Sequence, residues 1–190
     1  YLKAYYPEHF MASVMSSELG NTDKIYALTQ ECVRMGIKVL KPNIVSSSKR
    51  FLVNDKNEIE YGLGAIKGVA DIFIKHVCES RKNKQFRDLW DFSKKVDIKL
   101  GGKKSLEALS QSGAFDSLSP SRSIAIACVE DMLKDGSLLN GENLKSGDLF
   151  ADFDESFDPY EKYKNIQNLT LSEKLELEKK SLGYYLSGHP

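Results

Sequence analysis

Cysteine is scarce in this sequence, and it comes in an odd number. Cys32, Cys78 and Cys128 stand far apart among apolar neighbours, with no Cys-x-x-Cys pair and no nearby pair of histidines. This spacing excludes a disulfide framework and the usual kinds of zinc site. It favours three buried thiols in a reduced protein, and we expect a cytoplasmic location.

Long apolar runs are missing too. No stretch approaches the roughly 18 consecutive apolar residues that a membrane-spanning helix needs, so we expect no membrane partner. The chain opens on Tyr1 and Leu2, without an initiator Met, a charged segment or an apolar segment of a targeting signal. We therefore expect its ends to be cut from a longer protein.

Recognisable catalytic motifs are also absent. The sequence has no nucleotide-binding phosphate loop, no dinucleotide fingerprint and no His-Glu-x-x-His metalloprotease motif. The acidic cluster from Asp152 to Asp158 lacks the spacing of a calcium loop, so we interpret it as a solvated linker. We assign no catalytic residue, metal ligand or cofactor, and we disfavour a stand-alone enzyme such as a nuclease.

The formal net charge of zero conceals two opposed regions. Residues 61–104 hold 11 Lys or Arg against 5 Asp or Glu, whereas residues 130–161 hold 2 against 10. Such an asymmetry indicates two kinds of partner, or one partner and a solvated linker. The run from Arg81 to Lys84 is either an ordinary solvated loop or one flank of an anion-binding groove.

Apolar periodicity predicts a mainly α fold with one small β-hairpin. Two short helical pieces interrupted by Pro7 come first, and then a helix with caps at residues 21–23 that stops at Gly36. Residues 37–40 read as extended, and residues 50–53 and 58–61 as the two strands of the hairpin. The further helices are expected at residues 71–81, 86–95, 103–111, 121–135 and 172–181, and residues 136–158 as an exposed acidic linker.

Two glycine turns share one local plan, a helix-compatible apolar run followed by a short turn and a second helix. The first turn contains Lys67, Gly68, Val69 and Ala70, and the second contains Gly113 and Ala114, with Lys103 and Lys104 nearby in sequence. Glycine exposes backbone N–H groups at a helix start, where a phosphate oxygen can approach them. The alternative is that each turn is a plain structural corner. In the same region, Phe86, Trp90 and Phe92 are interpreted as core and His76 as structural.

Four stretches resemble the bacterial replicative DNA polymerase III alpha subunit, in the order and spacing of that family. They are residues 1–10 (YLKAYYPEHF), 61–69 (YGLGAIKGV), 106–116 (LEALSQSGAFD) and 182–190 (LGYYLSGHP). The resemblance implies a fragment with three parts. Residues 1–60 would end the fingers domain, residues 61–135 would form a tandem helix-hairpin-helix region that binds duplex DNA, and residues 136–190 would lead to an OB domain.

The resemblance also implies roles for individual residues. The phosphate-binding role carries onto Gly68, Val69, Ala70, Gly113 and Ala114, which would contact the backbone of duplex DNA without reading the base sequence. Their place beside the two turns adds Lys67, Lys103 and Lys104 to these predicted contacts. A sliding clamp would bind Ser146, Asp148, Leu149 and Phe150, with Ser146 where the family has Gln. The catalytic aspartates and their Mg²⁺ would belong to an earlier domain of the polymerase, and its other domains and subunits would be partners. The rival hypothesis is an interaction scaffold that does not bind DNA.

Overall fold

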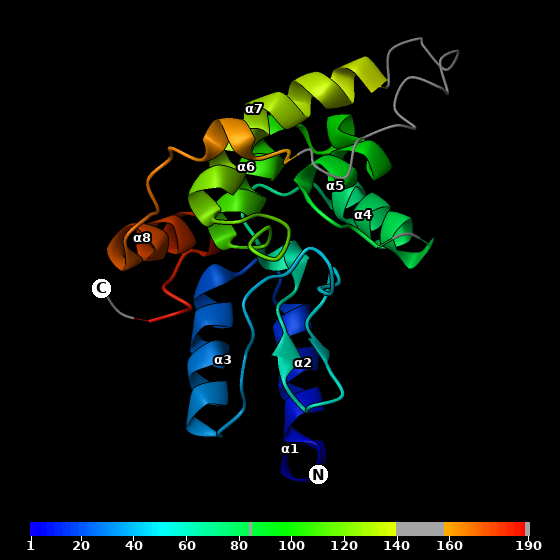
Figure 1. Cartoon of the computed structure of the whole chain (residues 1–190). Coiled ribbons are helices and arrows are strands. Elements are labelled where there is room, and N and C mark those ends of the chain that lie inside the picture. The colour runs from blue at the N-terminus through cyan, green and yellow to red at the C-terminus, as the bar shows by residue number, and fades with distance from the viewer. Residues whose placement is uncertain (84, 140–157, 189–190) are drawn as a thin grey trace.

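The computed structural model of the chain describes residues 1–83, 85–139 and 158–188, with the backbone alone at 135–139. It is mainly helical and has one two-stranded antiparallel hairpin, as the sequence predicts (Figure 1). In chain order the elements are α1 (Leu2–Tyr5), α2 (Pro7–Ser17), α3 (Thr22–Arg34), β1 (Leu52–Val53), β2 (Ile59–Glu60), η1 (Leu63–Ala65), α4 (Asp71–Asn83), α5 (Leu89–Lys95), η2 (Ile98–Leu100), α6 (Gly102–Ser112), α7 (Arg122–Leu139), η3 (Glu161–Tyr163) and α8 (Leu171–Leu182).

The N-terminal helices α1, α2 and α3 form an arm below the rest of the body (Figure 1). Pro7 occupies the first turn of α2, where its missing N–H costs nothing, so the chain forms two helical pieces as predicted. The Asn21 side chain caps α3 by accepting the N–H of Lys24 at 3.2 Å. The helix then ends before Gly36, which adopts a φ of +73°.

The hairpin lies against α2 and pairs Leu52 with Glu60 and Val53 with Ile59. The Asn54 carboxamide oxygen accepts the N–H groups of Lys56 and Glu58, both at 2.9 Å, which closes the polar turn. Ile59 also forms a parallel bridge with Val39. The extended segment predicted at residues 37–40 therefore lies beside β2 and joins it by this single isolated bridge.

Helices α4 to α7 pack around an aromatic centre. The rings of Phe73, Phe86, Phe92 and Phe115 meet edge to face around Phe92, at centroid distances between 5.1 and 6.4 Å. Phe86 and Phe92 are thus core residues, as predicted. The expected helix at residues 86–95 begins three residues late, because the Asp88 carboxylate caps it by accepting the N–H of Asp91.

His76 and the cysteines have structural roles or surroundings. The His76 Nε2 atom accepts the backbone N–H of Asp97 at 2.9 Å, which confirms the structural interpretation. Cys32 and Cys128 are buried, and burial raises the pKa of each thiol to about 11. Cys78 is only half-buried, so the prediction of three buried thiols is correct for two of them.

After residue 157 the chain returns to the body rather than leaving it. The Tyr160 hydroxyl donates to the carbonyl of Leu118 at 2.6 Å and accepts the N–H of Leu89 at 3.0 Å. The Tyr163 hydroxyl bonds the Asp131 carboxylate on α7. Because α7 continues to Leu139, the linker predicted to start at residue 136 is helical over its first four residues.

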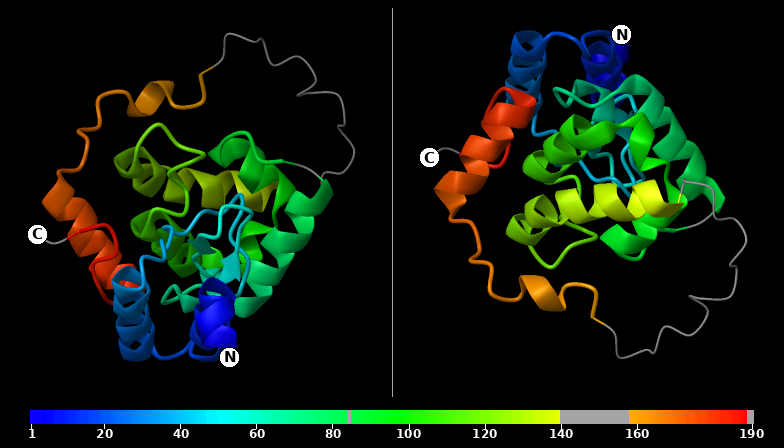
Figure 2. Two further views of the ribbon diagram at one scale, coloured as in Figure 1. Left: turned by 90° about the horizontal axis from the view of Figure 1, so that it is seen from below. Right: turned by 90° about the horizontal axis from the view of Figure 1, so that it is seen from above.

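Helix α8 closes the fold. Both views in Figure 2 place it beside α3, and its contacts also reach α6. Thr170 and Glu173 form a capping box at its start, and Gly183 ends it with a φ of +93°. The buried core runs from Met11 to Tyr184 and includes residues from all three predicted ranges. The domain division at residues 60 and 135 stays a prediction.

Candidate nucleic-acid interface

The first glycine turn lies on the surface between η1 and α4. Gly68 has a φ of +90°, in the left-handed region that favours glycine. Both Gly68 and Lys67 are exposed to solvent. Val69 and Ala70 are half-buried and lead directly into α4 at Asp71. The turn therefore presents its backbone to solvent at the start of a 13-residue helix, where the helix dipole favours an anion.

Two of the four N–H groups in this turn are already bonded. The Lys67 N–H donates to the carbonyl of Ser181 at 2.8 Å, and the Ala70 N–H donates to the Ser105 hydroxyl at 3.1 Å. The N–H groups of Gly68 and Val69 have no acceptor within the described parts of the chain. The N–H groups of Gly68 and Val69 are therefore the donors of this turn that remain available for the predicted phosphate contact. The N–H groups of the first turn of α4, which have no partner within the helix, can add to them.

The side chain of Lys104 packs against this turn. A Cβ atom at Gly68 would meet the Lys104 Cε, Cγ and Cδ atoms at 3.1 to 3.7 Å, so the stem of this lysine lies across the glycine. The Lys67 ammonium turns instead toward Gly183 at the end of α8. Asp71 at the start of α4 is paired with Lys49 at 2.6 Å, which reduces its repulsion of an anion.

Lys103 points away from the turn. Its ammonium bonds Glu130 on α7 and lies 3.9 Å from Glu107, and the hydrogen bond with Glu130 raises the pKa of Lys103. Two carboxylates therefore balance its charge. Of the two adjacent lysines predicted for the interface, the geometry brings Lys104 to the first turn and leaves Lys103 in ion pairs.

The start of α6 adds a feature that our sequence analysis missed. Gly101 and Gly102 begin this helix without a side-chain cap, and no acidic residue occupies its first turn. Lys104 follows in that same first turn and reaches Gly68. The starts of α4 and α6 are therefore neighbours, and the Gly-Gly-Lys-Lys run is the sequence signal that could have shown it.

The second glycine turn has different surroundings, because it is buried. Gly113 ends α6 with a φ of +85°, and its N–H bonds the carbonyls of Leu109 and Ser110. The N–H of Ala114, which is fully buried, bonds the same Leu109 carbonyl at 3.0 Å. These groups close the helix end and are not presented to a phosphate. Both N–H groups are thus used within the chain, as expected for the alternative of a structural corner, and the phosphate contacts predicted for Gly113 and Ala114 stay a prediction.

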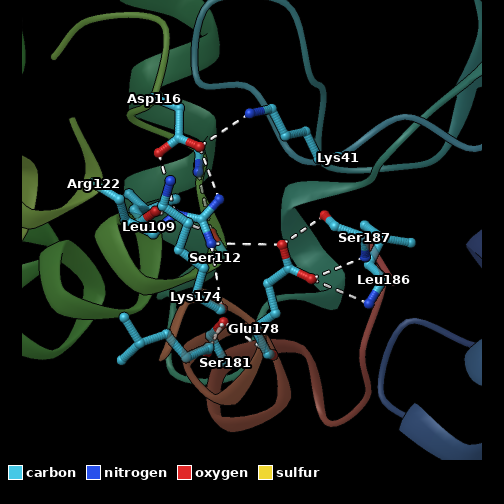
Figure 3. A network of polar contacts seen from close by, with 12 residues as sticks. Lys41, Leu109, Ser112, Asp116, Arg122, Lys174, Glu178, Ser181, Leu186 and Ser187 are labelled. Atoms are coloured by element: carbon cyan, nitrogen blue, oxygen red, sulfur yellow. Dashed lines mark hydrogen bonds and ion pairs between the residues drawn. The ribbon is translucent and has the colours of Figure 1, made fainter. Parts of the chain in front are cut away.

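An ion network holds the second turn in place (Figure 3). The Arg122 guanidinium is 5% exposed and donates to Asp116 through Nη2 at 2.8 Å and Nε at 3.3 Å. Its Nη1 atom lies 3.5 Å from Oε1 of Glu178, which is 2% exposed. The Glu178 carboxylate also accepts the N–H groups of Leu186 and Ser187. The network therefore joins the second turn, α8 and the C-terminal segment.

The charges in this network stabilise one another. Burial alone would raise the pKa of Asp116, but its hydrogen bonds and attraction to Arg122, and then to Lys41 at 3.0 Å, hold that pKa below its ordinary value. Burial likewise opposes the charge of Arg122, and Asp116 and Glu178 outweigh it and raise the Arg122 pKa. Both groups are therefore ionised at neutral pH.

The remaining predicted residues and partners have no counterpart in this geometry. Ser146, Asp148, Leu149 and Phe150, predicted for the clamp, lie outside the described residues. Across the parts of the chain that the structure describes, no three acidic, His or Cys side chains gather as a metal site would require. In the same parts, every helix is too short or too polar to cross a membrane.

Comparison with known proteins assigns the chain to a family. A family profile described as a helix-hairpin-helix motif matches residues 36–125, which include both glycine turns. Over the whole chain, DNA polymerase III subunit alpha is 42% identical in Pasteurella multocida, 40% in Escherichia coli K12 and 37% in Pseudomonas fluorescens. The chain is homologous to one segment of the DNA polymerase III alpha subunit. It spans 17 to 18% of the length of these relatives.

Alanine substitutions test whether Gly113 is packed against Arg122. A Cβ atom at Gly113 would lie 2.3 Å from Arg122 Nη2, whereas one at Gly36 meets nothing within 4 Å. Both glycines have a positive φ, so an alanine costs about 1–2 kcal/mol of backbone strain at either. We expect Gly113→Ala to lower the free energy of unfolding by about 1–3 kcal/mol more than Gly36→Ala, measured by urea denaturation. Equal losses would contradict the packing against Arg122.

The lowered pKa of Asp116 makes a prediction about acid. A carboxyl whose pKa is depressed by folding stabilises the fold above its unfolded pKa of about 3.9, and this contribution disappears as the pH falls through the folded pKa. At pH 7 we expect Asp116→Asn to lose about 3 kcal/mol of stability, because it removes one charged partner of the buried Arg122. The gap between wild type and variant should narrow below about pH 4. A gap that stays constant in urea titrations down to acid would contradict the Arg122 pairing.

Proposed function

We propose that this chain binds duplex DNA through the sugar-phosphate backbone, as one segment of a replicative DNA polymerase. The observation that carries the proposal is the exposed first turn. Within a region matched by a helix-hairpin-helix profile, it offers the N–H groups of Gly68 and Val69 and the cation of Lys104. Backbone N–H groups at a helix start bind phosphate oxygens and do not distinguish bases.

The proposal is narrower than a tandem grip. Of the two turns, only the first presents free N–H donors. The second turn uses its N–H donors to end α6, and its glycine leaves room for the Arg122 guanidinium. We assign a supporting role to the second glycine turn. Its ion network anchors α8, and the Ser181 carbonyl of α8 accepts the N–H of Lys67 in the first turn. The first turn would contact DNA, and the second would hold the first in position.

Template-directed synthesis by the complete polymerase is part of the same proposal, and so are its Mg²⁺ ions, its other subunits and a cytoplasmic location. These activities and partners are assigned to parts of a longer protein. For the 190 residues here we propose a DNA-holding role without catalysis.

The proposal predicts a loss of DNA binding when the first turn acquires a negative charge. Gly68→Asp places a carboxylate where the phosphate would lie, and we expect it to weaken binding to a short duplex by about tenfold or more at low salt. Gly36→Asp is the matched control, since it adds the same charge at an exposed glycine with a similar φ of +73°. Gly36 follows the C-terminal end of α3, a helix of 13 residues that is about 20 Å long. Fluorescence anisotropy against several salt concentrations measures both.

The same titrations separate the proposal from its rival. Wild-type affinity should fall steeply with salt and vary little with base sequence. Lys104→Gln should lower the slope of log affinity against log salt by about one, because one cation leaves the interface. A Gly68→Asp chain that binds DNA as tightly as the Gly36→Asp chain would favour the interaction scaffold instead.

Tethering of a sliding clamp is the second part of the proposal. Its support is the sequence Ser146 to Phe150, which resembles a clamp-binding peptide. The 18 residues from 140 to 157 run between Leu139 of α7 and the anchored segment at Asp158. At about 3.5 Å per extended residue, a peptide midway along them can reach about 30 Å from its attachments.

Two apolar residues should carry this contact. We expect the double substitution Leu149→Ala and Phe150→Ala to abolish binding of the chain to a purified bacterial clamp, because such anchors fill an apolar pocket. The matched control is alanine at Leu138 and Leu139, which precede the segment. Surface plasmon resonance measures both, and unchanged affinity of the first variant would exclude the assignment.

A further inference from the structure

Ser105 is a buried residue whose hydroxyl reaches out of its own helix. It lies on α6, is 1% exposed, and accepts the N–H of Ala70 at 3.1 Å. The same hydroxyl donates to the carbonyl of Gly68 at 3.3 Å. It therefore bonds the first glycine turn on both sides of Val69, across more than 30 residues of sequence.

This behaviour differs from that of the next buried serine on α6. The Ser110 hydroxyl donates to the carbonyl of Leu106, four residues earlier, at 2.9 Å. Its second contact is a longer one of 3.4 Å, to the carbonyl of Ala125 on the neighbouring α7. That local bond is the common choice of a serine inside a helix. Ser105 instead uses both its donor and its acceptor on the turn.

The geometry explains how the free N–H of Val69 is oriented. The Gly68 C=O and the Val69 N–H belong to one planar trans peptide group, so the hydrogen bond from Ser105 to this carbonyl points the Val69 N–H away from Ser105. The next peptide group is fixed as well, because its Ala70 N–H donates to the same hydroxyl. Within the described residues, no other side chain bonds the backbone of residues 67–70. The adjacent Lys104 packs its stem on Gly68. One pair of neighbouring residues on α6 thus supplies both the support and the cation.

We propose that Ser105 is a positioning residue for the phosphate-binding turn. The inference rests on the proposed function of that turn and adds to it. Ser105 contacts no phosphate itself. It holds the N–H of Val69 in the orientation that a phosphate oxygen requires, and it fixes the start of α4 against the start of α6.

The test compares Ser105→Ala with Ser110→Ala in the 190-residue chain. Each variant removes one buried hydroxyl from α6, so each should lower stability to a similar extent. We expect only Ser105→Ala to weaken duplex binding, by about five- to twentyfold, with an unchanged salt slope because no cation is lost. An equal effect of the two variants on binding would overturn the inference.

Amide hydrogen exchange reports on the individual N–H groups of the turn rather than on overall stability. It can be measured on the wild-type chain even if a variant fails to fold. Without DNA, the Ala70 amide should be protected, while those of Gly68 and Val69 exchange fast and become protected on adding duplex. Fast exchange at Ala70 would overturn the inference. Absence of any duplex binding by wild type, with Ala70 still protected, would instead remove the proposed function and leave Ser105 a purely structural residue.

Discussion

The buried guanidinium of Arg122 is the constraint on which the C-terminal half of the fold depends. A charge at 5% exposure is tolerated only with partners, and Asp116 and Glu178 provide them from different elements. Removal of one member of such a group leaves an uncompensated charge and costs about 3–5 kcal/mol. The turn after α6, the start of α7 and the middle of α8 are therefore fixed relative to one another by one side chain.

This constraint explains why two similar sequence patterns have different roles. Gly68 and Gly113 both have a left-handed φ, and both stand beside a helix end. At Gly113 the missing side chain makes room for Arg122, whereas at Gly68 it leaves a surface that only the stem of Lys104 approaches. Burial decides between a structural corner and an anion-binding turn, and burial depends on residues far away in sequence.

The local parts of the fold could be predicted because their signals are local. Helix ends are marked by the ring of Pro7, the capping side chain of Asn21 and the positive φ of Gly36 and Gly183, and the structure places helix ends at each of them. The pairing of Lys103 with Glu130 could not be predicted in this way, nor could the burial of Gly113. Those features depend on the packing of α6 against α7 and α8, which periodicity does not reveal.

The return of the chain at Tyr160 was missed for the same reason. Its sequence neighbourhood is polar and rich in turn formers, which is typical of an exposed segment. Two hydrogen bonds of the Tyr160 hydroxyl, to Leu118 and Leu89, nevertheless seat the ring in the body. The Tyr163 hydroxyl, bonded to Asp131, anchors the same segment a second time.

Helix α8 contacts both glycine turns through two residues that are three positions apart. Glu178 meets Arg122 beneath the second turn, and the Ser181 carbonyl holds the N–H of Lys67 in the first. Residues three apart share one face of a helix, so a rigid shift or rotation of α8 displaces both contacts together. A displacement of the C-terminal segment that moved α8 would therefore also disturb the turn proposed to hold DNA.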